Sequence, residues 1–94
     1  MAKSKDIGIT ASGRIISRRM LSHSGFVTLD NKGIITKVYV SRNIVCPGKD
    51  KTLFDKSFKD TKLGDTLAVV GDMVKVHGQP YLNAKELHFT KINF

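Results

Sequence analysis

Hydrophobic and polar residues alternate with the two-residue period of β-strands along much of this chain. In FVTLD, residues 26–30, the alternation places Val27 and Leu29 on one face, and in TKVYV it does the same for Val38 and Val40. These four residues are predicted to face the core. By the same pattern, or by their content of β-branched residues, strands are predicted over residues 7–21, 26–30, 34–42, 66–76 and 81–92.

Glycine-containing turns separate several of these strands. The turns are SHSG at 22–25, NKG at 31–33 and HGQP at 77–80. We expect Gly33 to supply a positive φ in its hairpin. Gly13 and Gly71 lie inside predicted strands, where an isolated glycine indicates a bend or a bulge.

The period changes after the third strand. A loop is predicted over residues 46–52, and then Leu53, Phe54 and Phe58 recur at helical spacing. A short helix is therefore predicted over residues 53–62, ended by the glycine of LGD.

The order of elements predicts an all-β fold, a five-stranded Greek-key OB-fold barrel with a short helix between strands 3 and 4. A small SH3-like barrel is the main alternative, and the position of the helix argues against it. Ninety-four residues allow one domain. We expect a flexible basic arm over residues 1–6 and an OB-fold nucleic-acid-binding domain over residues 7–94.

The charge of the chain points to a polyanionic partner. Lys and Arg total 16 against 8 for Asp and Glu, for a net charge of +8. A small domain with this excess of positive charge is typical of nucleic-acid binders. An anionic membrane is disfavoured, because the sequence has neither an apolar run of about 18 residues nor a basic amphipathic helix.

The residue inventory does not favour catalysis or metal binding. Cys46 is the single cysteine, and His23, His77 and His88 lack the spacing of metal ligands. No nucleophile–base set or phosphate-cradling glycine loop is recognisable. The sequence predicts no catalytic residue, metal or cofactor, and no enzyme activity for this chain. The N-terminus lacks a secretory h-region, so a reducing, cytoplasmic setting is expected.

An OB barrel commonly binds nucleic acid on the face of its second and third strands. Alternation turns Phe26, Thr28, Lys37 and Tyr39 outward there. Aromatic rings stack on unpaired bases, and nearby cations neutralise phosphates. The alternatives are that Phe26 closes one end of the barrel and that Tyr39 is a surface residue without a ligand.

Arg18 and Arg19 are adjacent on a predicted strand, so their side chains point to opposite faces. From spacing alone, only one of them would be assigned to binding. Both could reach one ligand if the strand bends or lies at an edge.

One stretch is similar to a known family. GRIISRRMLSHSGFVTL, residues 13–29, resembles the N-terminal anticodon-binding OB-fold domain of class II lysyl-tRNA synthetases. The resemblance continues through residues 38–42 and 53–78 and into KELHFTKI at 85–92. The aspartyl and asparaginyl enzymes carry a sister domain, but the helix followed by LGD favours the lysyl type.

The resemblance implies roles for several residues. Phe26 matches the aromatic residue that stacks on the middle anticodon base, Arg18 and Arg19 match basic residues that hold the anticodon loop, and Tyr39 lies in the strand lining that face. RNA, and a tRNA anticodon loop above all, is the implied partner. The nucleic-acid-binding residues that we expect are Arg14, Arg18, Arg19, Phe26, Thr28, Lys37, Tyr39 and Gln79.

Two positions depart from the family. A glutamine and a glutamate read the uridine edge in the family, and Lys37 and Gln79 occupy the matching positions here. Lys37 can donate to a carbonyl but cannot accept, whereas the amide of Gln79 can do either. We therefore expect relaxed specificity or a shifted anticodon preference.

The sequence has no residues that could form the adenylate made by a ligase, so either a ligase fragment or a free-standing paralogue is expected. An attached ligase domain and a homodimer are both open. Two other functions stay open as well. One is generic binding of single-stranded nucleic acid, and the other is a protein-interaction or dimerisation module.

Overall fold

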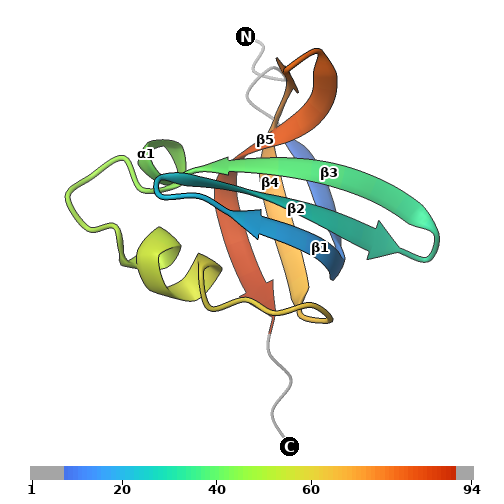
Figure 1. Ribbon diagram of the computed structural model, residues 1–94, viewed down its shortest axis with the longest axis horizontal. Coiled ribbons are helices and arrows are strands. Elements are labelled where there is room, and N and C mark those ends of the chain that lie inside the picture. Colours follow the sequence, from blue (N-terminus) through green and yellow to red (C-terminus); the bar gives the residue numbers. More distant parts are fainter. Residues whose placement is uncertain (1–7, 91–94) are drawn as a thin grey trace, which may run out of the picture.

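The computed structural model describes residues 8–90 as a closed five-stranded barrel (Figure 1). The strands follow the order β1-β2-β3-β5-β4, and β3 and β5 are the parallel pair. This arrangement confirms the predicted OB-fold. The elements are β1 (Ile9–Met20), β2 (Ser24–Asn31), β3 (Ile34–Ser41), α1 (Arg42–Val45), η2 (Leu53–Phe58), β4 (Thr66–Val76) and β5 (Gln79–Thr90).

The long strand β1 closes the barrel by changing partners along its length. Its first half pairs with β4 and its second half with β2, and the register shifts between Ile15 and Ser17. The irregularity therefore lies just after Gly13, the residue that predicted it. Gly13 itself permits a close approach, because a Cβ there would lie 2.7 Å from the backbone oxygen of Asp30.

Two-residue turns close both long hairpins. Lys32 and Gly33 have φ angles of 54° and 92°, and His77 and Gly78 have φ angles of 53° and 80°. Positive φ at both central residues is the requirement of a type I′ turn, whose twist matches that of the flanking strands. The prediction for Gly33 is confirmed. The second turn has fewer residues than the predicted turn at 77–80, because β5 already begins at Gln79.

The predicted helix between strands 3 and 4 is present but shorter and wider than expected. The Lys59 N–H donates to the Phe54 carbonyl, five residues back, at 3.2 Å, which is a π-helical bond. The helical residues of η2 end at Phe58, so the predicted extension to residue 62 is wrong. A further helical turn, α1, follows β3 and was not predicted.

The core lies inside the barrel and under η2. Val27, Leu29, Val38 and Val40 are buried, as their alternation predicted. The rings of Phe54 and Phe58 are fully buried with centroids 5.4 Å apart, which is why the helical spacing of these residues was informative. The other core residues are Ile15, Val45, Cys46, Leu67, Val69, Leu82, Ala84 and Leu87.

Some expectations fall beyond the described part of the chain. The basic arm at residues 1–6 and the last predicted strand residues, 91–92, lie outside residues 8–90. Within the described residues, none of the helices has the length and apolar character needed to cross a membrane.

Candidate nucleic-acid interface

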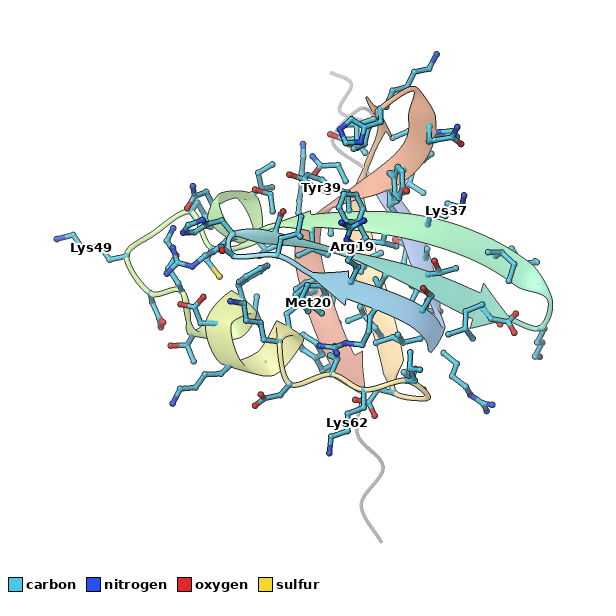
Figure 2. The ribbon with its side chains drawn as sticks, in the orientation of Figure 1. Arg19, Met20, Lys37, Tyr39, Lys49 and Lys62 are labelled. Carbon is cyan, nitrogen blue, oxygen red and sulfur yellow. The ribbon has the colours of Figure 1, made fainter. Side chains whose placement is uncertain are left out.

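A groove of about 1010 Å³ lies over the outer face of the barrel and is lined by residues of all five strands. It brings together six of the eight residues predicted to bind nucleic acid. These are Arg19, Phe26, Thr28, Lys37, Tyr39 and Gln79. Figure 2 shows Arg19, Lys37 and Tyr39 on this part of the sheet, with Lys62 apart from them at the lower edge of the view.

The strand register aligns the central residues of the groove in one row. Arg19 of β1 lies directly opposite Phe26 of β2, Phe26 lies opposite Tyr39 of β3, and Tyr39 lies opposite Asn83 of β5. Neighbouring strands are spaced about 4.8 Å apart, so the row places a cation, two aromatic rings and an amide side by side on one surface.

Three aromatic side chains form the floor of the groove, and we call Phe26, Tyr39 and Tyr81 the aromatic cluster. The ring centroids of Phe26 and Tyr39 are 5.2 Å apart, with the ring planes tilted by 50°. Tyr81 meets Phe26 edge-on, at 5.3 Å and 65°. These distances and angles are those of favourable aromatic pairs, so Phe26 packs against both tyrosine rings.

Tyr81 and Asn83 belong to the groove but were not predicted to bind. The signal that could have found them is the alternation of YLNA, in which Leu82 and Ala84 are buried and the other two residues face outward. That signal says which face they share, but not which strand lies beside them.

The groove is positively charged. Its lining includes Arg19, Lys37 and Lys75, and no carboxylate among the described residues. Lys37 lies opposite Thr28 in the β2–β3 register. The hydroxyl of Thr28 and the ammonium group of Lys37 therefore belong to neighbouring positions on the groove surface. A concave surface of one charge sign concentrates the field and favours an anionic ligand.

Arg18 lies on the other side of β1 and does not line the groove. Its Nη2 donates to the carbonyl oxygen of Lys59 at 2.9 Å, and its Nε is buried without a partner among the described residues. The opposite orientations expected for Arg18 and Arg19 are therefore observed. Because of them, only Arg19 lies within the groove.

Arg14 also lies outside the groove. It occurs before the bulge of β1, opposite Asp30 of β2 and Thr66 of β4, and its side chain is exposed. The groove lining does not include it.

Away from the groove, a bidentate ion pair joins α1 to η2. Nε and Nη2 of Arg42 donate to the two carboxylate oxygens of Asp55 at 2.8 and 2.9 Å. These hydrogen bonds lower the pKa of Asp55 and raise that of Arg42 relative to their ordinary values. The described residues contain no group of three or more His, Cys, Asp or Glu side chains that could hold a metal ion.

No protein-family model matches the chain, but individual proteins do. It is 34% identical over 83 residues to a lysine–tRNA ligase from Yersinia enterocolitica, a match that covers 87% of this chain and 16% of that protein. The chain is similar to one segment of lysine–tRNA ligases. The ligase of Pectobacterium atrosepticum is 33% identical over 82 residues and that of Porphyromonas gingivalis is 29% identical over 83 residues. The chain spans about a seventh of the length of these lysine–tRNA ligases.

A solved structure supports the fold independently. A chain of the S. pombe Stn1-ten1 complex superposes with a TM-score of 0.69, covering 92% of this chain and 60% of that one. Its sequence identity is only 15%. The structural likeness to the Stn1-ten1 chain shows the OB-fold. The sequence similarity is to a segment of lysine–tRNA ligases.

Proposed function

We propose that this chain binds RNA through the groove, and that its ligand is the anticodon loop of a tRNA. The observation that carries the proposal is the row formed by Arg19, Phe26 and Tyr39, which places a cation beside two half-buried aromatic rings that line the groove. The similarity to lysine–tRNA ligases supports a tRNA as the source of the RNA.

The row suits an unpaired loop more than a duplex. Bases in a loop can be splayed out and stacked on aromatic side chains, whereas the bases of an A-form helix are inaccessible to such rings. The ring of Phe26 lies between Tyr39 and Tyr81, so successive bases can use the aromatic cluster. Arg19, Lys37 and Lys75 then neutralise phosphates of the same strand.

Base edges are read from the margin of this surface. Lys37 of β3 and Gln79 at the start of β5 both line the groove. The ammonium of Lys37 is assigned to a phosphate, so the amide of Gln79, which can donate or accept, is the group that reads the base edge. Phosphate contacts provide affinity, and base contacts provide the preference for one base over another. We expect the affinity for RNA to be strong and the preference among bases to be weak.

Titration with two RNAs of equal length and charge tests the proposal. One is an anticodon stem-loop and the other a linear oligonucleotide, and fluorescence anisotropy reports the affinity for each. We expect tighter binding to the stem-loop. Equal affinities would instead assign the chain to generic single-stranded nucleic-acid binding, which uses the same face.

A variant pair ties binding to the groove. Phe26→Ala should weaken stem-loop binding by about 1–3 kcal/mol, the value of one base–aromatic stack. Leu63→Ala removes an exposed apolar side chain outside the groove and should leave binding unchanged. If both variants bind like the wild type, the RNA site lies elsewhere.

A further inference from the structure

A second groove, of about 460 Å³, lies where β3 and β5 begin, and residues near the start of β1 and Met73 of β4 complete its lining. Its lining is mostly apolar, with no aromatic ring. Ile9, Ile35 and Met73 line it although 47%, 52% and 53% of their surfaces are exposed. Exposed apolar side chains that gather in one hollow indicate an interaction site.

β3 has a free backbone edge beside the second groove. It pairs with β2 along its whole length but with β5 only over residues 38–40, and towards its turn it extends away from β5 (Figure 1). Pro80 of β5 lacks an N–H and cannot continue the pairing. Because Ile34 flanks a two-residue turn, its backbone bonds to β2, and the N–H groups of Ile35 and Lys37 point the other way. The described residues place no strand beside these two N–H groups.

The charge around the second groove favours an acidic ligand. Lys37 is the one charged side chain of its lining among the described residues. Asp30 lies opposite Ile35, but its Oδ1 accepts the N–H of Gly33 at 2.9 Å, so this carboxylate is engaged at the turn. A second copy of the chain would bring another net charge of +8 to the same place, and like charges repel.

We propose that the second groove docks an extended, acidic segment of a partner protein. The segment adds a strand to the free edge of β3, where its carbonyl groups accept the N–H groups of Ile35 and Lys37. In such strand addition the backbone bonds provide affinity, and pockets for alternate side chains provide specificity. Alternate apolar side chains of the segment contact Ile9 and Met73, and a carboxylate pairs with Lys37. This inference does not depend on RNA binding.

Nuclear magnetic resonance of the ¹⁵N-labelled protein, without RNA, tests the proposal with a synthetic probe. The probe is an acetylated and amidated hexapeptide that alternates valine with glutamate and threonine. We expect saturable shifts of the amide signals of Ile35 and Lys37, with a dissociation constant below about 1 mM. Hydrogen exchange of both amides should slow when the peptide binds. A peptide with lysine in place of glutamate should bind at least about tenfold more weakly, because it meets Lys37 with a like charge.

Three variants locate the peptide. Met73→Glu places a carboxylate in the second groove and should abolish binding of the acidic peptide, whereas Leu63→Glu adds the same charge at an exposed apolar residue outside it and should bind like the wild type. Ile35→Pro removes one edge N–H, at a position where an edge strand tolerates proline, and should cost roughly three- to tenfold in affinity. Circular dichroism and thermal melting verify that each variant is folded.

Four results would overturn the proposal. One is an absence of amide shifts at Ile35 and Lys37, and another is equal binding by Met73→Glu and Leu63→Glu. Slow hydrogen exchange at these two amides without peptide would show that the chain itself already covers the edge. Shifts of the same signals that grow with protein concentration alone would assign the second groove to another copy of the chain.

Discussion

The guanidinium of Arg18 donates through Nη2 to the carbonyl oxygen of Lys59 at 2.9 Å, so β1 is joined to the residue that follows η2. Its neighbour Arg19 points the other way and lines the groove. Two adjacent arginines of identical chemistry therefore have separate tasks. One holds the helical segment against the barrel, and the other is available to a ligand.

Substitution of these two arginines should give opposite phenotypes. Arg18→Ala removes a charge-assisted hydrogen bond and should lower the free energy of unfolding by about 1–3 kcal/mol, measured by urea denaturation. RNA affinity of the folded variant should change little. Arg19→Ala should leave unfolding nearly unchanged and weaken stem-loop binding. If Arg18→Ala instead weakened RNA binding and Arg19→Ala lowered stability, Arg18 and not Arg19 would contact the RNA.

Tyr81 should contribute to binding although sequence reasoning did not select it. Its ring meets Phe26 at 5.3 Å on the floor of the groove. Tyr81→Ala should weaken stem-loop binding by about 1–3 kcal/mol, through the lost stacking surface. Tyr81→Phe retains the ring and should bind like the wild type in the same titration. A loss in Tyr81→Phe would show that the hydroxyl, and not the ring, makes the contact.

The salt dependence of RNA binding should report which lysines face the phosphates. Lys37 lines the groove, whereas Lys62 lies outside it, at the lower edge of Figure 2. Lys37→Ala should reduce the slope of log K against log salt by about 1, because one fewer counterion is released. Lys62→Ala removes the same charge and should keep the wild-type slope. Equal slopes for the two variants would mean that only net charge matters.

Gly71 allows β4 and β5 to approach each other at the register shift. A Cβ at this position would lie 1.9 Å from the backbone oxygen of Asn83, which cannot move without breaking the pairing. Gly71→Ala should therefore lower the free energy of unfolding by at least about 2 kcal/mol. Gly48→Ala is the matched control, since a Cβ there meets nothing within 4 Å. Its unfolding midpoint in urea should stay close to that of the wild type.

The ion pair between Arg42 and Asp55 should make stability depend on acidity. The guanidinium of Arg42 holds the pKa of Asp55 below its ordinary value. The ion pair therefore contributes fully to stability above the aspartate pKa of the unfolded chain, about 3.9. This contribution is lost as the pH falls through the lower pKa of Asp55 in the folded state. Thermal melting of Asp55→Asn should depend less on pH below about 4 than that of the wild type.

Arg42→Gln removes the partner and should give the same flattened melting profile as Asp55→Asn. A profile for Arg42→Gln that matches the wild type would show that another group lowers the pKa of Asp55.

Much of the barrel and part of the candidate site could be predicted from local pattern. The two-residue period follows from the geometry of a single strand, so it separated Val27 and Val38 from Phe26 and Tyr39 without knowledge of any partner. Gly33 was recognisable because a two-residue hairpin turn demands positive φ.

Tertiary structure decided what the outward residues meet. Parallel pairing of β3 with β5 brings Asn83 beside Tyr39, 44 positions earlier in the sequence, and no local period encodes that pairing. The position of η2 likewise directs Arg18 to a carbonyl and leaves Arg19 free for the groove. Alternation along one strand determined which residues face outward. Only closure of the barrel, which depends on contacts distant in sequence, decided which of them share a surface.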